Sequence, residues 1–236
     1  MRIIAGPCQH ESYEQSLTIA RECQRVCNNH NVEFIFKASF DKANRSSDNS
    51  KRGVGIDQTL QDFRKIKSTF PSFKMLTDVH EKEHVNIIQT VYFDVIDVIQ
   101  IPYNIIQNEF SDLELLTLKK KFKFLEIHAR SIFHQGLLLK KINKNKNQKF
   151  KKLMNEQSKI LDQLYNICKK NNCSSLDLCL SYVLKKKFID KIVIGVDNSN
   201  ELSHILNYRK VKNMKFNKII YNKSILDPIS WLKLKY

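Results

Sequence analysis

Glycine, proline and tryptophan are scarce in this chain, whose 236 residues include five Gly, four Pro and one Trp. This scarcity excludes collagen-like and Pro-rich architectures. Apolar residues still make up 42% of the chain, which is enough for a packed core and excludes wholesale disorder. Long apolar runs are also absent, because the stretch 91–101 is interrupted by Asp94 and Asp97 and is far shorter than the ~20 residues of a membrane span. We therefore expect a globular protein with no membrane partner.

Signals for export are lacking as well. Met1 and Arg2 lead directly into a short apolar stretch that ends at Gly6, so we expect no targeting segment. The six cysteines include no CxxC pair and do not have the spacing of a small secreted domain. Both features favour a reduced, cytoplasmic setting.

Acidic residues are few relative to basic ones, and the imbalance is confined to one part of the chain. Overall, 40 Lys and Arg face 24 Asp and Glu, a formal charge of +16. Residues 1–102 hold 13 basic and 13 acidic side chains, whereas residues 103–236 hold 27 and 11. The most basic stretch, 140–152, has almost no apolar content and is predicted to be a solvated loop. A phosphate or nucleic-acid contact is the alternative there, and we expect no nucleic-acid partner because regularly spaced aromatic residues are missing.

Short β-branched runs alternate with stretches in which apolar residues recur every three or four positions. The expected strands are 3–5, 34–37, 74–78, 95–100, 125–129 and 191–195, and the expected helices are 12–28, 56–68, 158–170 and 174–185. Such βα repetition favours a parallel sheet with crossover helices. A closed βα barrel has eight strands. We therefore predict an α/β fold with TIM-barrel-like βα repeats, as an incomplete or chimeric barrel with about six recognisable strands.

Functional side chains of βα proteins follow the carboxyl ends of the strands. The segment FKASFDKANRSS (36–47) stands at such a place and gathers Lys37, Lys42 and Arg45 with several hydroxyl and amide side chains. Ammonium and guanidinium groups together neutralise and hydrogen-bond phosphate or carboxylate. The segment indicates a site for a phosphorylated, polyanionic small molecule, and a generic polar loop is the alternative interpretation.

Five motifs in the first half of the chain resemble one enzyme family. They are IAGPCQHES at 4–12, FKASFDKANRSS at 36–47, the pair Gly53 and Gly55, LTDVHE at 76–81 and DVIQIP at 97–102. Together they resemble 3-deoxy-D-manno-octulosonate 8-phosphate synthase, also called 2-dehydro-3-deoxyphosphooctonate aldolase. The resemblance implies a TIM-barrel transferase of lipopolysaccharide biosynthesis that joins phosphoenolpyruvate to arabinose 5-phosphate with release of phosphate. Synthases of this type are commonly tetrameric, so a homo-oligomer is expected.

The same resemblance assigns roles to individual residues. It implies that phosphoenolpyruvate binds to Lys37, Ser39 and Lys42, with Gln100 nearby, and that the phosphosugar binds to Asn44, Arg45, Ser46 and Asp78. Cys8 matches the position of a divalent-metal ligand in one branch of the family, and a buried thiol is the alternative interpretation. No counterparts of the other metal ligands, or of two further cations that bind phosphoenolpyruvate, follow Pro102. His10 and His80 are expected to have structural roles.

The second half of the chain resembles a different family. The segments FDVIDVIQIPYNI, EIHARSIFHQGLLL at 126–139, FIDKIVIGVDNSNEL at 188–202 and LDPISW at 226–231 resemble the carboxyl-terminal half of an aldo-keto reductase. That half of the family's barrel binds NADPH. The implied cofactor contacts are Gln100, Tyr103, Arg130, Ser131, Gly195, Asp197 and Asn198. The reductase's catalytic Asp, Tyr, Lys and His belong to the half that this sequence lacks.

The two resemblances meet within one expected strand. We therefore predict two half-barrels, 1–102 and 103–236, packed as one domain, and interpret the charge asymmetry as a change of ancestry. Three functional hypotheses follow. The first is a synthase-like transferase, with or without remaining activity. The alternatives are an NADPH-binding reductase-like protein and a non-catalytic fusion remnant.

Overall fold

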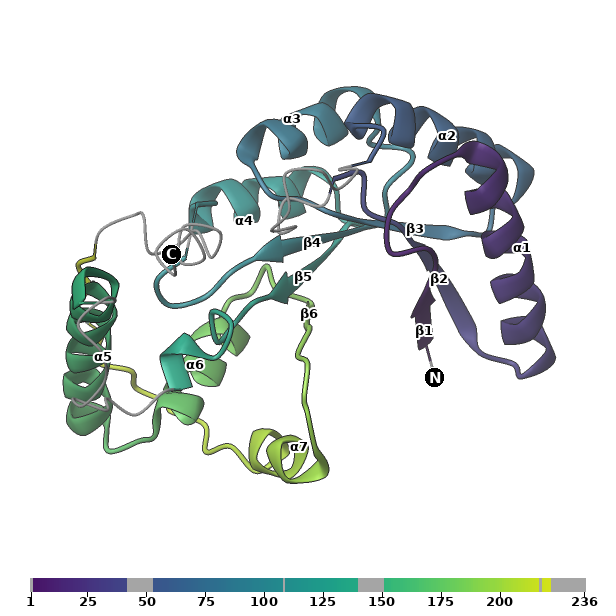
Figure 1. The fold of residues 1–236 in the computed structure, drawn as a ribbon. Coiled ribbons are helices and arrows are strands. Elements are labelled where there is room, and N and C mark those ends of the chain that lie inside the picture. Colours follow the sequence, from purple (N-terminus) through teal and green to yellow (C-terminus); the bar gives the residue numbers. More distant parts are fainter. Residues whose placement is uncertain (1, 42–52, 108, 140–150, 217, 222–236) are drawn as a thin grey trace. The chain divides into compact units, whose positions relative to one another are not determined.

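In a computed structural model, residues 2–41, 53–107, 109–139, 151–216 and 218–221 are described. Strands and helices alternate along the chain (Figure 1). The strands are β1 (Arg2–Ala5), β2 (Glu33–Lys37), β3 (Lys74–Asp78), β4 (Val98–Pro102), β5 (Glu126–Arg130) and β6 (Lys191–Ile192). The helices are α1 (Tyr13–Asn29), α2 (Ile56–Thr69), α3 (Lys82–Val91), α4 (Asp112–Lys121), η1 (Leu137–Leu139), α5 (Lys151–Asn171), α6 (Ser175–Leu184) and α7 (Ser199–Leu206).

The six described strands form one parallel sheet in the order β1-β2-β3-β4-β5-β6. Ala5 pairs with Phe36 between β1 and β2, and Asp78 pairs with Gln100 between β3 and β4. Each strand is thus followed along the chain by its neighbour in the sheet, as βα repetition requires. The fold is an incomplete TIM-barrel-like α/β fold, which confirms the predicted class.

Local sequence signals set several helix boundaries. The Ser12 side chain caps α1 by accepting a hydrogen bond from the Gln15 N–H at 3.2 Å. Ser174 and Asp177 form a reciprocal capping box at the start of α6, in which each side chain accepts the other residue's backbone N–H. Both serines stand at the first position of a helix expected from the sequence.

Other boundaries differ from the prediction. β4 begins at Val98 and not at residue 95, because Val95 and Ile96 belong to a buried turn in which the Val95 N–H bonds the Tyr92 carbonyl at 3.0 Å. Both residues are apolar, and hydrophobicity alone does not separate a buried turn from a strand. The helices α3, α4 and α7 were not predicted. Of the polar stretch 140–152, the last two residues belong to α5 and the others lie outside the described residues.

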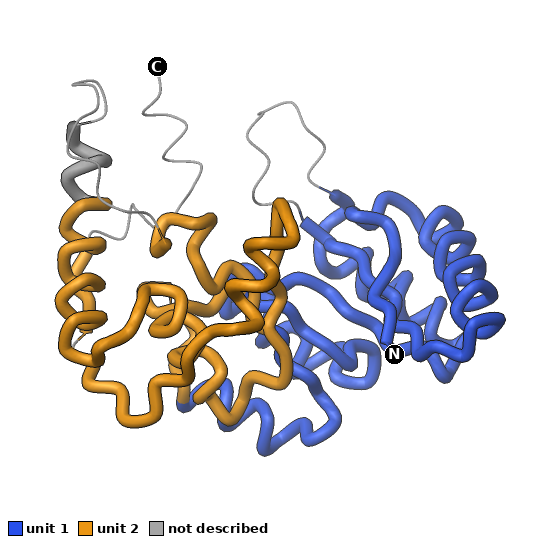
Figure 2. The backbone as a smooth tube through the Cα atoms, turned by 90° about the horizontal axis from the view of Figure 1, so that it is seen from below, with its two compact units in different colours: residues 1–101, 113–128 blue, residues 102–112, 129–236 orange. Residues whose placement is uncertain are grey.

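Two compact units make up the chain (Figure 2). Unit 1 comprises 1–101 and 113–128, and unit 2 comprises 102–112 and 129–236. In unit 1, Phe36 of β2 and Phe63 of α2 are fully buried and pack edge to face with ring centroids 5.6 Å apart. In unit 2, apolar residues of α5 and α6 form a core that includes Ile160 and Leu178. No helix in the described part of the chain has the length and apolarity needed to cross a membrane.

Alternation along the strands of unit 1 gives one face of the sheet three chemically distinct levels. Ion pairs connect the amino ends, where Arg2 contacts Glu33 and Glu126, each at 2.8 Å. Two positions further along, Ile35, Leu76 and Val98 form a buried apolar cluster. Two positions beyond that cluster stand the predicted polar residues of β2, β3 and β4. The apolar level thus supports the residues at the carboxyl ends of the strands.

Candidate functional site

The carboxyl ends of β2, β3 and β4 bring three predicted binding residues to one edge of the sheet. Lys37 and Asp78 are the last residues of β2 and β3, and Gln100 pairs with Asp78 across β3 and β4. The Asp78 and Gln100 residues are each only 8% exposed. Burial of the two polar side chains Asp78 and Gln100 at one edge is costly unless they are hydrogen-bonded. Their arrangement therefore needs specific partners.

Lys37, Ser39 and Asp78 supply these partners to one another. The Lys37 Nζ atom lies 2.9 Å from the Ser39 Oγ and 2.9 Å from the Asp78 Oδ2, and the Ser39 hydroxyl donates to the same carboxylate oxygen. An ammonium group has three N–H donors. Two of them are used here, so the Lys37 ammonium, whose side chain is 21% exposed, retains one donor for an incoming anion.

Backbone contacts hold the loops around this triangle. The φ of Gly6 is +154°, and a Cβ built on it would lie 2.2 Å from the Lys37 carbonyl oxygen. Gly53 has a φ of +111° and lies against the Phe40 carbonyl, where a Cβ would approach to 2.3 Å. Only glycine permits such approaches. Phe40 belongs to the segment FKASFDKANRSS. The close approach of Gly53 therefore brings the chain that follows this segment back against Phe40.

Gln9 is a residue of this site that the sequence interpretation missed. It forms an isolated β-bridge with Ser39 and is 5% exposed. Among the described residues, no hydrogen-bond partner reaches its Oε1 atom. A buried amide oxygen without a partner is unusual, and this oxygen could accept a hydrogen bond from a ligand. Its place just after β1, at the carboxyl edge of the sheet, was the available signal.

The remaining predicted residues of this half are distributed differently. Lys42, Asn44, Arg45 and Ser46 lie outside the described residues. Cys8 is exposed, and no group of three or more metal-binding side chains occurs in the described ranges. The described residues therefore do not supply a ligand set for the implied divalent metal, and the role of Cys8 stays a prediction.

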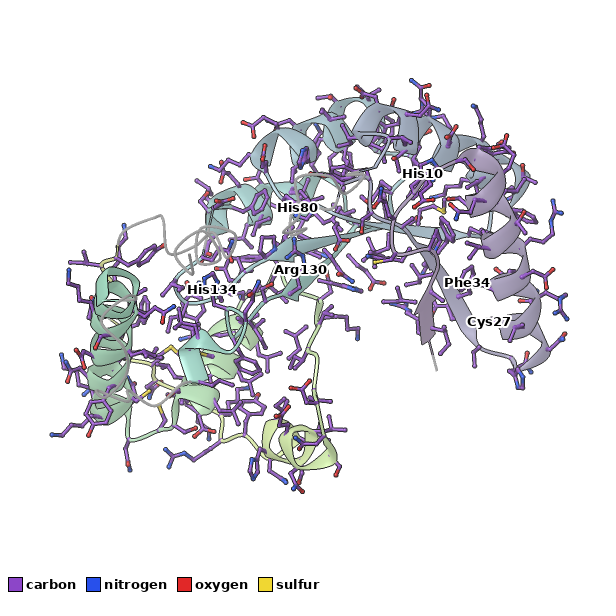
Figure 3. All side chains as sticks on the ribbon, in the orientation of Figure 1. His10, Cys27, Phe34, His80, Arg130 and His134 are labelled. Carbon is purple, nitrogen blue, oxygen red and sulfur yellow. The ribbon has the colours of Figure 1, made fainter. Side chains whose placement is uncertain are left out.

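His10 belongs to the loop after β1 (Figure 3), is fully buried and contacts residues of α1 and α2. Its ring nitrogens lie 2.8 Å from the Ser16 Oγ and 3.1 Å from the Asp62 Oδ2. Burial raises the pKa of Asp62, and hydrogen bonds from Gln58, Lys65 and His10 outweigh this effect and lower it. Ser16 is also fully buried. The Ser-His-Asp arrangement is thus closed to substrates, in agreement with a structural role for His10.

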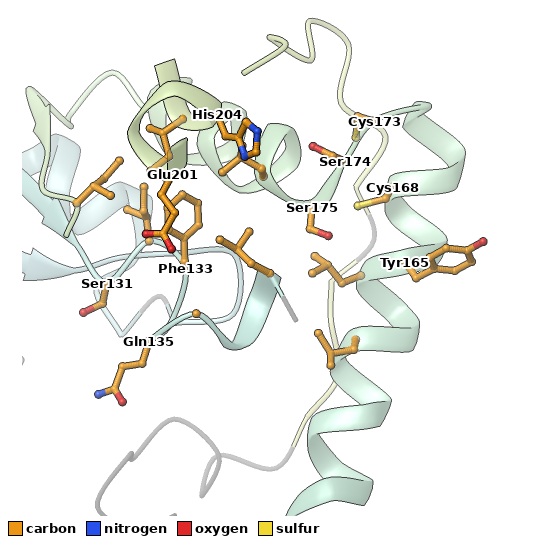
Figure 4. A pocket seen from close by; sticks show the side chains of 18 of the residues that line it. Ser131, Phe133, Gln135, Tyr165, Cys168, Cys173, Ser174, Ser175, Glu201 and His204 are labelled. Atoms are coloured by element: carbon orange, nitrogen blue, oxygen red, sulfur yellow. The ribbon is translucent and has the colours of Figure 1, made fainter. Parts of the chain in front are cut away.

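Unit 2 contains a cavity of about 1480 Å³. Four of the predicted cofactor contacts line it, namely Arg130, Ser131, Gly195 and Asp197. Figure 4 shows its lining, to which α5, α6 and α7 contribute. The volume exceeds the several hundred Å³ of a typical ligand site. Its size and mixed polar and apolar lining suit an extended cofactor.

Two further predicted contacts lie elsewhere in unit 2. Tyr103 is fully buried, with its ring stacked on Tyr182 at 6.1 Å and its hydroxyl donating to the Asp112 Oδ1 at 2.5 Å. Burial and the bond to Asp112 raise the Tyr103 pKa. A nicotinamide ring could stack on Tyr103 only after Tyr182 moved away. Asn198 caps α7 by accepting the Glu201 N–H at 2.9 Å.

Two cysteines of the cavity wall are poor nucleophiles. Cys168 and Cys173 line it. Burial raises the pKa of Cys168 to about 11 and also raises that of Cys173. Since the thiolate is the reactive form, both side chains are protonated near neutral pH and unsuited to covalent catalysis.

Two family models match the chain. The DAHP synthetase I family matches residues 1–118, and the aldo/keto reductase family matches residues 76–220. Both resemblances inferred from the sequence are thereby confirmed. The matches overlap at residues 76–118, which include β4.

Several curated relatives match about two fifths of the chain. A 2-dehydro-3-deoxyphosphooctonate aldolase of Helicobacter pylori (strain P12) is 45% identical over 100 residues, 42% of this chain and 34% of the relative. A protein of the same name from Campylobacter jejuni subsp. doylei is 43% identical over 102 residues, 43% of this chain and 36% of the relative. Another from Agrobacterium fabrum is 40% identical over 100 residues, 42% of this chain and 34% of the relative. The chain thus spans about a third of the length of the curated relatives it matches.

Proposed function

Because the chain belongs to the DAHP synthetase I family through residues 1–118 and to the aldo/keto reductase family through residues 76–220, we propose a function for each half. Unit 1 binds phosphoenolpyruvate and arabinose 5-phosphate and acts as a 3-deoxy-8-phosphooctulonate synthase-like transferase. The triangle of Lys37, Ser39 and Asp78 at the strand ends carries this proposal.

The chemistry of this triangle suits an anionic substrate. Lys37 offers its remaining N–H to a carboxylate or phosphate oxygen, and Ser39 holds the ammonium in position. Preorganised donors of this kind stabilise charge that develops during a reaction. Asp78 accepts hydrogen bonds and suits sugar hydroxyls. In the proposed reaction, carbon 3 of phosphoenolpyruvate attacks the sugar aldehyde, water adds at carbon 2 and inorganic phosphate leaves.

Phosphate release tests catalysis. The full chain is incubated with both substrates, and inorganic phosphate is measured against reactions that lack arabinose 5-phosphate. We expect release that depends on both substrates and falls at least tenfold in Lys37→Gln. Release at background level, the same in the parent and in Lys37→Gln, would falsify the transferase proposal.

Lys74→Gln is the matched control for this experiment. Lys74 lies on the same face of the sheet as Lys37 but at the amino end of β3, where it pairs with Glu33 at 2.8 Å. Lys74→Gln removes the same charge as Lys37→Gln, but at the opposite end of the strands. Phosphoenolpyruvate affinity should therefore stay within about twofold of the parent's. Calorimetric titration with phosphoenolpyruvate alone separates loss of binding from loss of turnover. Saturable binding without turnover would identify a non-catalytic remnant.

A second candidate function is NADPH binding in unit 2. It is favoured by the cavity that four predicted cofactor contacts line. Arg130 offers a cation for the pyrophosphate, and its guanidinium reaches the Ser131 hydroxyl at 3.4 Å. A titration of NADPH fluorescence should saturate with the parent and weaken several-fold with Arg130→Gln. Arg64→Gln, which removes an exposed cation from unit 1, is the control. Absence of saturation in the parent argues against this function.

Cellular context follows from the first proposal. A transferase that consumes phosphoenolpyruvate would act in the cytoplasm, on the route to lipopolysaccharide. We also propose a homo-oligomer without nucleic-acid or membrane partners. Light scattering of the purified chain should give a mass that is a multiple of 27.8 kDa, and a monomeric mass would reject the oligomer.

A further inference from the structure

A second, smaller cleft occurs in unit 2, between the end of α5 and the segment 209–215. Its volume is about 350 Å³. The chain that follows α7 returns to α5 (Figure 1) and supplies most of the lining. Three asparagines and one valine line the cleft, together with five cationic residues. These five are Lys170, Arg209, Lys210, Lys212 and Lys215. The cleft shares Asn172 with the large cavity but no other lining residue.

Hydrogen bonds fix the walls of this cleft. The Asn171 side chain donates to the Lys215 carbonyl and accepts the Lys215 N–H, both at 2.8 Å. The same amide nitrogen also donates to the Ile167 carbonyl within α5 at 2.8 Å. At the other end, the Arg209 N–H bonds the Asp177 Oδ1 at 2.6 Å, and the Val211 N–H bonds the Ser181 Oγ at 2.8 Å. The segment 209–215 is therefore attached to two helices.

Most of the charge of the cleft is not neutralised by the part of the chain that the structure describes. No acidic residue lines it, and all five cationic residues are exposed. Within the described ranges, none of the five side chains forms an ion pair. The neighbouring Asp177 carboxylate accepts bonds from the Arg209 backbone and from Ser174 and attracts the Arg209 charge, which leaves the four lysines of the cleft without a described acidic partner. Like charges held close together repel, and a bound anion would relieve that repulsion.

We propose that this cleft binds a compact polyphosphate, such as the diphosphate or triphosphate group of a small molecule. Three properties define this ligand class. The cationic residues match several phosphate oxygens at once. The volume accommodates a small ligand. The lining has no aromatic side chain and only Val211 as an apolar residue, so no aromatic ring in the cleft would stack on a nucleobase. The site is independent of the functions proposed above.

Titration calorimetry of the full chain with inorganic tripolyphosphate tests the inference. The test variant combines Lys210→Gln, Lys212→Gln and Lys215→Gln, which keep a polar side chain at each position and remove three charges. We expect saturable binding by the parent and at least a tenfold weaker Kd in the variant. Raising the salt from 50 to 200 mM should weaken binding, as screening of ionic contacts requires.

A charge-matched control excludes a general effect of net charge. The control combines Lys120→Gln, Lys121→Gln and Lys123→Gln, three exposed lysines of unit 1. Its Kd should stay within twofold of the parent, and circular dichroism should show both variants folded. The inference is overturned by no saturable binding, or by equal losses in the two triple variants. Tighter binding of single-stranded RNA than of tripolyphosphate, per phosphate, would also overturn it and assign the cleft to nucleic acid.

Discussion

Replacement of Gly6 by alanine tests how the first loop and β2 together build the strand-end site. The new Cβ would lie 2.2 Å from the Lys37 carbonyl oxygen, whereas real Cβ atoms essentially never approach closer than 3.0 Å. The backbone after β1 must therefore move by about 0.8 Å away from the last residue of β2. A carbonyl oxygen is part of the backbone and cannot turn aside as a flexible side chain can. The displacement therefore reaches Lys37 and the triangle.

Two terms give the expected magnitude. An alanine at a φ of +154° costs roughly 1–2 kcal/mol. Forcing atoms into an occupied space adds roughly 1–3 kcal/mol. Gly6→Ala should therefore lower the free energy of unfolding by about 2–5 kcal/mol, and phosphoenolpyruvate affinity should fall as well.

Urea unfolding followed by far-UV circular dichroism measures this loss. Gly55→Ala is the matched control, because Gly55 has a φ of +87° but no atom within 4 Å of a built Cβ. At the start of α2 it carries the cost of positive φ and of a poorer N-cap, roughly 1–2 kcal/mol. If both variants lose the same stability to within about 0.5 kcal/mol, the argument from the Lys37 carbonyl is refuted.

Three further predictions follow from the contacts of single residues. Leu76→Ala should lower the free energy of unfolding by about 2–5 kcal/mol, since Leu76 is fully buried. In the same urea assay, Leu113→Ala should change the free energy of unfolding little, because Leu113 is 74% exposed. Asp62 has a lowered pKa in the folded state, so its stabilisation is present above about pH 4 and lost as the pH falls through the folded value. The stability difference between the parent and Asp62→Asn should accordingly vanish in acid, and a difference that persists there contradicts the assignment. Iodoacetamide at pH 8 should label exposed Cys8 before Cys168, as mass spectrometry of peptides can show, and the reverse order would disprove the pKa argument.

Contacts between neighbouring strands were accessible from the sequence. Lys37 and Asp78 each end a short strand-like run, and parallel strands have their carboxyl ends at the same edge, so their proximity followed from pattern alone. Gln9 was missed because its place just after β1 is shared by other polar residues of the same loop, and among the described residues only its burial and its unpartnered oxygen distinguish it. Tyr103 shows the opposite case. The family resemblance implies a ring that contacts the cofactor, whereas in the structure the ring is buried and stacks on Tyr182.

The sequence by itself determined the order of βα units, the caps at Ser12 and Ser174, and the change of family between the two halves, because these depend on local propensity and on short motifs. Tertiary structure alone decided which distant groups meet. Ser39 reaches Asp78 across 39 positions, and Asn171 holds Lys215 across 44. Such contacts depend on the path of the backbone through space, which composition and periodicity do not specify. The scarcity of acidic residues is visible in the printed sequence, but only folding places Lys170 beside Lys215 to make one cleft.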